Sequence, residues 1–438
     1  MKQLHKHARH AFGFVVVSLC AQATWSDAPY LALQDALEMG KTQSVDMRIQ
    51  TSQQHLSALA VDNAQAGLWP TLDLTSDISR PGPNLRGDPW LNNASRTQYE
   101  TAWRTNLALQ WVVFDGLGNW ANVDLARKNE AASSAKSAAV TLQLRTQIAA
   151  SYWEVSRAQA LCALYAENLS HSQELLRIAD AKHKLGANSL LDVRQAELDR
   201  NADSSATLKQ NLALMQAERV LNSILERDLE TSFTVDSLAI LDSTLNLETL
   251  HAALLKSQPQ LRAAQLAEQA SDANVRIAGS DWFPAVSVYA KYQFLEEYSA
   301  TAPPPDEHSQ GLLWGAQLSL PLFEGGRTRA KIASAKESRE LARYTTQQVT
   351  VNLEKALALS WASYQQSIQL WQMELHNSEL ANATYKLALE QYQLGAISAI
   401  EMRRLQESNT QAASRAAMAR FDAKQGELTL LTLSGVMD

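Results

Sequence analysis

Two stretches of the chain alternate between apolar and polar residues, over residues 70–114 and 284–323. In the first of them, Trp103 and Trp111 fall on one face of the pattern and Asn106 falls on the other. A period of two residues predicts β-strands with one apolar face. A proline-rich loop interrupts each stretch, so each stretch is predicted to form a β-hairpin.

The rest of the chain follows the period of 3.6 residues that is typical of helices. No proline occurs between Gly116 and Leu185, which predicts one helix of about 69 residues, roughly 100 Å long. A tight turn follows this helix, and a returning helix extends to about residue 227. The second half repeats this order from residue 326 to residue 433.

Shorter helices precede both hairpins. Residues 32–68 are predicted to be helical with a break near Gly40, and Pro259 opens a helix that reaches about Trp282, because proline is tolerated in a first helical turn. In each half, the short helix and the returning helix together have nearly as many residues as the long helix. We therefore predict long antiparallel α-helical hairpins, with strands at one end and tight turns at the other.

Short motifs recur along the chain at one constant spacing. Phe114-Asp115-Gly116 recurs 209 residues later as Phe323-Glu324-Gly325, and Leu185-Gly186-Ala187 recurs as Leu394-Gly395-Ala396. Several matches in one register imply a structural unit that is used twice. After its N-terminal segment the chain divides into a first repeat, a small mixed insert on the flank of the bundle and a second repeat, over residues 24–227, 228–258 and 259–438.

The N-terminus has the order of a secretory signal peptide. Basic residues precede an apolar run that ends at Cys20, and small residues follow, so residues 1–23 are predicted to be removed. Attachment of a lipid to Cys20 is the alternative. It is disfavoured because Leu19 stands where a small residue normally precedes a lipidated cysteine. Without Cys20, Cys162 is the single cysteine, and no intrachain disulfide can form.

Composition and charge narrow the class of protein. The 438 residues include only 16 glycines and 11 prolines, as expected of a mostly helical protein. With 46% hydrophobic and 19% charged residues, the chain is not of the disordered class. The net charge is −7, and the loss of three basic residues with the signal peptide makes the mature chain more acidic. An acidic chain argues against nucleic acid as a partner.

No run of 18 apolar residues follows the signal peptide, so a helical membrane span is not predicted. The strands, of about ten residues with an aromatic-rich apolar face, match the pattern of outer-membrane strands. Candidates for an aromatic girdle at the membrane surface are Trp103, Trp111, Tyr292 and Trp314. A soluble sheet that packs on its own helices also alternates, and it is the alternative interpretation.

The four predicted strands of one chain cannot close a membrane barrel, because known barrels have at least eight strands. An open sheet edge in lipid leaves backbone groups unpaired, at a cost of several kcal/mol each. We therefore predict that chains assemble. A dimer would supply eight strands and a trimer twelve, and the number of strands alone does not choose between them.

Further segments are characteristic of a known family. Phe283-Pro284 enters a strand, the stretch from Leu318 to Arg327 leaves one, and the two Leu-Gly turns keep one register. On these segments and the duplicated order, the whole mature chain resembles the TolC-like outer-membrane efflux family. The resemblance implies a homotrimer, in which four membrane β-strands per protomer form one β-barrel and the helical hairpins form a periplasmic α-barrel. It also implies that the turns meet a periplasmic adaptor protein of an inner-membrane pump, and that a resting tunnel opens when the tip helices move.

The two turns supply the candidate adaptor contacts: Leu185, Gly186, Ala187, Ser189, Leu394, Gly395, Ala396 and Ser398. Glycine suits a left-handed turn and allows the backbone of a partner to approach closely. Any helical hairpin needs a turn glycine, which is the simpler interpretation. The paired leucines at an exposed tip favour contact with a partner.

Charged residues beside the turns are candidate gate residues. Asp192 and Glu401 occupy matching positions and could pair with arginines such as Arg403 to hold the tips closed. Equally, each carboxylate could stabilise the first turn of its helix through the macrodipole. Some family members have carboxylates shortly before the second turn glycine, where this chain has Lys386. That departure puts an acidic gate in doubt.

Little in the sequence supports catalysis. It contains no nucleotide-binding glycine loop, paired-histidine zinc helix, nucleophile elbow or cysteine pair, so no enzyme, cofactor or metal site is predicted. We predict an outer-membrane channel that extends into the periplasm and serves as the exit duct of a tripartite efflux or type I secretion system. The alternative is a soluble periplasmic coiled-coil adaptor or scaffold protein.

Overall fold

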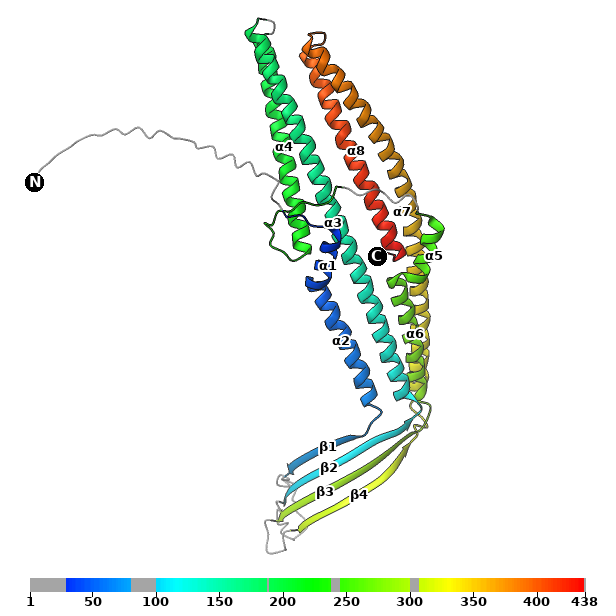
Figure 1. Ribbon diagram of the computed structural model, residues 1–438. Helices are drawn as coiled ribbons and strands as arrows, with labels where there is room; N and C mark the ends of the chain where they lie inside the picture. Colours follow the sequence, from blue (N-terminus) through cyan, green and yellow to red (C-terminus); the bar gives the residue numbers. More distant parts are fainter. Residues whose placement is uncertain (1–28, 80–99, 187–188, 238–244, 300–306, 437–438) are drawn as a thin grey trace, which may run out of the picture.

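The computed structural model describes residues 29–79, 100–186, 189–237, 245–299 and 307–436. The predicted signal peptide with Cys20 and the turn residue Ala187 lie outside these ranges. Figure 1 shows long helices side by side, with a four-stranded sheet at one end and two tight turns at the other. The architecture is mainly α-helical with a smaller β part, as predicted.

Two helices of 67 residues each run the length of the bundle, α3 (Gly118–Lys184) and α7 (Arg327–Gln393). At 1.5 Å per residue, each is about 100 Å long. The shorter helices are α1 (Leu33–Gln43), α2 (Val45–Ala66), α4 (Leu190–Ile224), α5 (Leu247–Ser257), α6 (Pro259–Ser280) and α8 (Ala399–Ser434).

Each long helix is flanked by two shorter helices that follow one another along it (Figure 1). In the first half, α2 and α4 pack against α3, and in the second half α6 and α8 pack against α7. The helices of these pairs have 22 and 35 residues in the first half and 22 and 36 in the second. The halves also meet, because α3 packs against α6 and α8. The order of elements is therefore the same in both halves of the chain.

The duplicated motifs that begin with Phe114 and Phe323 turn the chain from a strand into a long helix. Gly116 has a φ of 71° and Gly325 a φ of 63°, a left-handed conformation that glycine adopts without strain. A Cβ on Gly116 would lie 2.6 Å from the carbonyl oxygen of Ser280, so glycine is also required by space. The turn thereby sets the direction in which α3 leaves the sheet.

The first helical segment breaks at Ser44 and not near Gly40, where we predicted the break. Gly40 is a buried residue inside α1. A Cβ at this position would lie 2.2 Å from Cδ1 of Ile148 on α3. The glycine therefore allows α1 to approach α3 closely, so its role is in packing and not in ending the helix.

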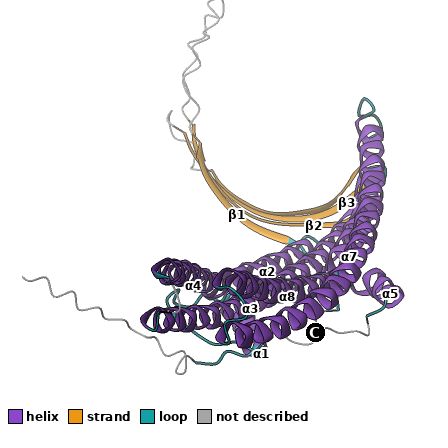
Figure 2. Cartoon of the chain, turned by 90° about the horizontal axis from the view of Figure 1, so that it is seen from above, coloured by secondary structure: helices purple, strands orange, loops and turns teal. Residues whose placement is uncertain are grey.

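The four strands form one antiparallel sheet in the order β1-β2-β3-β4, and Figure 2 shows its strong curvature. The strands are β1 (Thr71–Ser79), β2 (Glu100–Asp115), β3 (Ala285–Ser299) and β4 (Glu307–Ser319). β4 ends before the predicted limit at residue 323, ahead of Pro321, because proline has no N–H group to donate to a ladder.

The strand register places the apolar positions of all four strands on one face of the sheet. One row across this face consists of Leu74, Leu107, Tyr292 and Leu312. The adjacent row, on the opposite face, consists of Thr75, Asn106, Gln293 and Gly311. Leu74 is 71% exposed and Leu312 is 65% exposed, so the helices of the chain do not cover the apolar face. The alternative of a sheet packed on its own helices is therefore wrong for the described strands.

Within the described ranges, buried apolar residues form three clusters along the bundle. The largest surrounds Tyr152 and Leu221, where α1, α3 and α4 meet. A second surrounds Leu254 and Leu430 and joins α5 to α6, α7 and α8. The third lies near the turns and includes Tyr392. The bundle is thus held at its middle and near its tips by separate apolar contacts.

The predicted insert lies against the middle of the bundle. Thr234 forms a single parallel bridge with Tyr30, and the Tyr152 hydroxyl of α3 donates to the Asp236 carboxylate at 3.0 Å. These bonds attach the start of the insert to both α3 and the N-terminal segment. The insert ends in α5, and residues 238–244 lie outside the described ranges.

Candidate functional site

The glycines of the two turns at the end of the bundle have the same backbone conformation. We call residues 185–189, of which 187 and 188 lie outside the described ranges, tip 1, and residues 394–398 tip 2. Gly186 has a φ of 77° and Gly395 a φ of 79°. The N–H of Gly186 donates to the carbonyl of His183 at 2.9 Å, and the N–H of Gly395 donates to the carbonyl of Tyr392 at 3.1 Å. The left-handed glycines end the two long helices at equivalent points.

The tips project beyond the packing of the chain. Leu185 is 85% exposed and Leu394 is 86% exposed. A Cβ built on Gly186 or Gly395 would meet no atom within 4 Å, so backbone conformation and not crowding explains these two glycines. Bare leucines beside open backbone are the kind of surface that contacts another molecule.

The serine and the carboxylate that follow each turn form matching capping boxes. Ser189 Oγ accepts the N–H of Asp192 at 3.2 Å, and the Asp192 carboxylate accepts the N–H of Ser189 at 3.0 Å. Ser398 and Glu401 form the same two bonds at 3.2 and 3.0 Å. The backbone and hydroxyl of Ser398 donate to the ionised carboxylate and so hold the pKa of Glu401 below its usual value.

The capping boxes give Asp192 and Glu401 the helix-start role that was one of their two interpretations. Arg403 pairs with neither of them in the described part of the chain, and its partners are Asp203 and Glu407. Lys386 is exposed on α7. A role for these four predicted residues in a gate stays a prediction.

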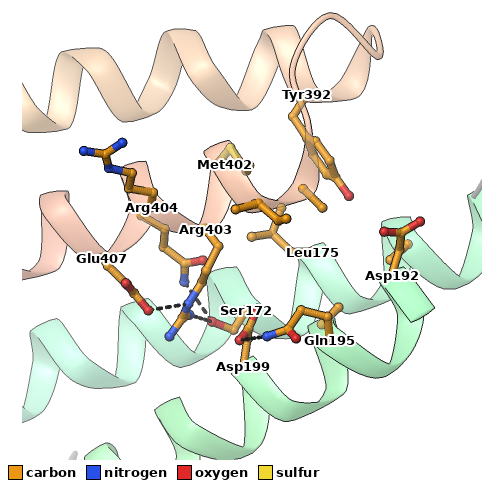
Figure 3. A pocket seen from close by; sticks show the side chains of 15 residues that line it. Ser172, Leu175, Asp192, Gln195, Asp199, Tyr392, Met402, Arg403, Arg404 and Glu407 are labelled. Atoms are coloured by element: carbon orange, nitrogen blue, oxygen red, sulfur yellow. Dashed lines mark hydrogen bonds and ion pairs between the residues drawn. The ribbon is translucent and has the colours of Figure 1, made fainter. Parts of the chain in front are cut away.

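Arg403 on α8 reaches across to Asp203 on α4. Its Nη1 and Nη2 atoms lie 2.5 and 3.0 Å from the two carboxylate oxygens, and the side chains of Arg403 and Asp203 are only 17% and 8% exposed. Ser172 of α3 donates to the same carboxylate. Figure 3 shows Arg403 directed toward Ser172 and Glu407. We call Ser172, Asp203 and Arg403 the clamp.

A buried hydrogen-bond network continues from the clamp. Gln406 Nε2 donates to Ser172 Oγ at 2.8 Å and to Asn168 Oδ1 at 2.9 Å. Thr410 Oγ1 donates to Asn168 Oδ1 at 2.8 Å. Because polar groups in the interior must keep their partners, this network fixes α8 against α3 in one register.

A second contact joins the two tips of the chain. Lys182, near the end of α3, donates from Nζ to the carbonyl of Tyr392 on α7 at 2.8 Å. The same Nζ lies 4.4 Å from the centroid of the Tyr392 ring, within the range of a cation–π interaction. Tyr392 is itself buried beside Met402, so Lys182 is anchored to a fixed group.

A cavity of about 390 Å³ lies between the clamp and the tips (Figure 3). Asp192 and Gln195 of α4 line one side, and Ile400 and Arg404 of α8 line the other. Leu175 of α3 contributes to its apolar lining. Its volume lies within the range of about 300 to 1,000 Å³ that is usual for binding pockets in proteins. The cavity also means that α4 and α8 lack a packed core between them at this level.

The predicted girdle residues all belong to the bare apolar face of the sheet. Trp103 is 47% exposed, Trp111 38%, Tyr292 45% and Trp314 76%. Trp103 Nε1 donates to Ser76 Oγ, and Trp111 Nε1 donates to the carbonyl of Leu68, both at 2.8 Å. Their depth in a membrane stays a prediction.

Sequence reasoning missed the clamp and the contact between Lys182 and Tyr392. Asp203 and Arg403 lie 200 residues apart, and no local pattern pairs them. A signal did exist in the helices, because Asn168 and Ser172 are polar residues one turn apart in an otherwise apolar stripe. Such a pair predicts a buried polar contact, although it does not name the partner.

The chain combines a curved sheet that has an exposed apolar face with helical hairpins of about 100 Å. This combination is the architecture of TolC-like channel subunits. The family described as outer membrane efflux protein matches residues 41–226 and 250–436. The chain therefore belongs to the outer membrane efflux protein family.

Characterised relatives carry related descriptions. The outer membrane efflux protein BepC of Brucella suis is 25% identical over 273 residues, which are 61% of this chain and 57% of that protein. The chain thus spans little more than half the length of this relative. The cation efflux system protein CusC of Escherichia coli K12 is 24% identical over 372 residues, 82% of this chain and 76% of that protein.

Solved structures show the same fold. The CmeC outer membrane channel of Campylobacter jejuni superimposes with a TM-score of 0.78 at 15% identity, over 92% of this chain and 85% of that chain. CusC superimposes with a TM-score of 0.77 at 20% identity, over 95% of each chain. At these identities the likeness is one of fold.

The predicted family, the mainly α-helical fold and the location in the outer membrane, extending into the periplasm, are confirmed. The prediction of an efflux channel is confirmed, and the alternative of a soluble coiled-coil adaptor is wrong. The family is one of channels and not of enzymes. Among the helices in the described ranges, none combines the length and the apolar character needed to cross a membrane.

Proposed function

We propose that three copies of this chain form the exit duct of a tripartite efflux system, with the apolar sheet face in outer-membrane lipid. The observation that carries the proposal is that bare face, on which Leu74 is 71% exposed. β1 and β4 are the outer strands of the protomer's sheet, and their free edges need partners in lipid. Three protomers would supply about twelve strands, enough to surround an aqueous lumen, whereas two would give a barrel filled by side chains.

Exposed apolar residues on the helices support the same assembly. Met373, Leu380 and Leu387 on α7 repeat every seven residues and are each at least 61% exposed. Leu191 and Leu198 on α4 have the same spacing and are 75% and 63% exposed. Residues seven positions apart return to nearly the same side of a helix, so these residues form exposed apolar stripes along α4 and α7. These stripes therefore favour pairing between α4 of one protomer and α7 of the next.

Membrane fractionation and chemical cross-linking test this assembly. We expect the full-length protein in the outer-membrane fraction, with altered migration after heating and a cross-linked product of three chain masses. A product limited to two chain masses would favour the dimer. A protein that remains in solution without detergent would refute the proposal.

The tips are proposed as the contact with a periplasmic adaptor protein of an inner-membrane pump. Their exposed leucines and open glycines support this role, as does the cavity beside them, which is lined by apolar and charged side chains. The partner that fits is a helical hairpin whose apolar side chains enter the cavity, because the site offers both helices and open backbone.

The variant Gly186→Asp with Gly395→Asp tests the tips, because aspartate tolerates the left-handed conformation but adds charge to the contact surface. We expect normal trimer assembly and loss of efflux in cells. The control is Gln53→Asp with Ser334→Asp, which adds the same charges at exposed helical positions far from the tips. Unchanged efflux by the tip variant would contradict adaptor binding at the tips.

A further inference from the structure

A further cavity lies on the sheet side of the clamp, and most of the side chains that line it are polar. Its volume is about 220 Å³, which is smaller than the usual pocket for a drug-sized molecule, so it suits one ring of a longer ligand. Helices α3, α7 and α8 supply eight polar residues, which we call the polar groove: Glu167, Asn168, His171, Ser378, Glu379, Asn382, Asn409 and Thr410.

The buried network that starts at the clamp reaches the polar groove through Asn168. This residue is only 7% exposed, and its Oδ1 accepts hydrogen bonds from Gln406 at 2.9 Å and from Thr410 at 2.8 Å. No described residue forms a hydrogen bond with its amide nitrogen, Nδ2. Because two donors hold the oxygen in place, the N–H groups of Nδ2 remain for a ligand in the groove.

Four other polar side chains line the groove without a hydrogen bond or ion pair to any described residue: Ser378, Glu379, Asn382 and Asn409. Ser378 and Asn409 are half-buried, so the fold takes them partly out of water and gives them no partner. Hydroxyl, amide and carboxyl groups of α7 and α8 thus surround the same cavity as the free amide of Asn168. Together these groups can donate and accept several hydrogen bonds to one ligand.

His171 adds a flat ring to the lining of the groove. Its imidazole lies 5.2 Å from the ring of Tyr385, measured between ring centroids, and its Nε2 atom lies 3.6 Å from the Glu167 carboxylate. Tyr385 is buried in the apolar cluster near the tips, so the imidazole contacts a group that is fixed. A ring beside a few convergent polar groups is the usual composition of a small-molecule site.

The charges of the groove argue against an ion as its ligand. Among the described residues, no group of three or more histidine, cysteine, aspartate or glutamate residues is placed to hold a metal ion. The lining includes the carboxylates of Glu167 and Glu379 but no lysine or arginine, so an anion would be repelled. Amides and hydroxyls outnumber the carboxylates, and they pair with a neutral ligand that is rich in hydroxyl and amide groups.

We propose that the polar groove binds an N-acetylated sugar unit of a glycan. The asparagine amides bond its hydroxyl and acetamido groups, Glu379 accepts from a hydroxyl, and the sugar ring rests on His171. Two sources offer this chemistry: the glycan of the cell wall, outside the duct, and a saccharide that is carried inside it. The first source needs only the periplasmic position of the helices, whereas the second rests on the duct under Proposed function.

Two binding measurements on the full-length protein in detergent test the groove. One is co-sedimentation with purified cell-wall sacculi, which are too large to enter a duct, and the other is binding of a soluble oligomer of N-acetylglucosamine. Asn382→Ala with Asn409→Ala removes two amides and should weaken binding about tenfold or more. The matched control is Asn63→Ala with Asn377→Ala, at exposed helical positions that do not line the groove, and it should bind like the parent protein.

Asn382→Ala alone, at an exposed position, should weaken binding about fivefold and serves if the double variant does not fold. Groove-dependent binding of both probes would make the cell wall the source of the sugar. Groove-dependent binding of the soluble oligomer alone would support the sugar site with a transported saccharide as its ligand. Binding of neither probe, or equal binding by the groove variants and the parent, would overturn the proposal. Cross-linking of the same samples reports assembly separately, so a failure of the trimer would leave the sugar measurement valid.

Discussion

The row of apolar residues across the sheet allows a direct test of which face meets lipid. Leu74 and Thr75 are neighbours on β1, both are exposed, and their side chains lie on opposite faces. Leu74 shares its row with Leu107, at the middle of the strand pairing, whereas Thr75 lies opposite Asn106. Arginine at either position adds the same charge and bulk, so only the surroundings of the two faces differ.

The expected cost of Leu74→Arg follows from its place near the middle of the apolar band. An arginine on the lipid face near the bilayer midplane lowers the free energy of unfolding by about 2 to 4 kcal/mol, so three copies in the proposed trimeric barrel lower it by about 6 to 12 kcal/mol. Thr75→Arg faces the polar side and should cost about 0 to 1 kcal/mol per chain.

The assay is the fraction of protein that folds into lipid vesicles, read from heat-modifiable migration over a urea series. Leu74→Arg should fold only at low urea or fail to assemble, and Thr75→Arg should match the parent protein. Equal destabilisation by the two variants, or a larger effect of Thr75→Arg, would refute the assignment of the apolar face to lipid.

Two further predictions concern the helical bundle. Gly40→Ala should destabilise the protein by about 1 to 3 kcal/mol because the new methyl group overlaps Ile148 Cδ1. The double variant Gly40→Ala with Ile148→Val lacks that Cδ1 atom and should recover most of the lost melting temperature. A double variant that melts as low as Gly40→Ala would contradict the close approach of α1 to α3. Burial raises the pKa of Glu218 to about 7 from an ordinary value of 4.5. As the pH rises, Glu218 therefore loses its proton in the unfolded chain before it does so in the folded protein. The free energy of unfolding should fall as the pH rises between these two values. Glu218→Gln should abolish this fall and stabilise the protein at pH 8 by about 3 kcal/mol. Denaturant unfolding of variant and parent at pH 5 and pH 8 measures the effect. An identical pH profile for the two proteins would contradict the raised pKa of Glu218.

Local patterns in the sequence predicted the elements well because their causes are local. The period of two residues identified the strands, and the serines that start α4 and α8 form the caps expected of helix starts. Gly40 was misinterpreted because a glycine can end a helix or admit a neighbour, and only the position of Ile148 decides between them.

The candidate site was predicted in part. The positions of the two turns were predicted because Leu185 and Leu394 repeat in register beside glycines, and their contact with an adaptor protein stays a prediction. The clamp was not found, because the contact of Arg403 with Asp203 depends on how two separate hairpins pack. The carboxylates of Asp192 and Glu401 illustrate the limit: the same spacing predicts a cap and a charged gate, and the structure supplies bonds for the cap.

The equal length of α3 and α7, at 67 residues each, would make the rim of the proposed trimeric duct level. An insertion of seven residues in each arm of one hairpin alone would raise its tip by about 10 Å above the other, leaving a notched rim that a docking protein could grip at alternate points only. Insertions and deletions in these helices should therefore be tolerated only as matched sets across both hairpins. The same rule offers a way to build longer or shorter ducts, by adding or removing whole heptads at equivalent positions of α3, α4, α7 and α8.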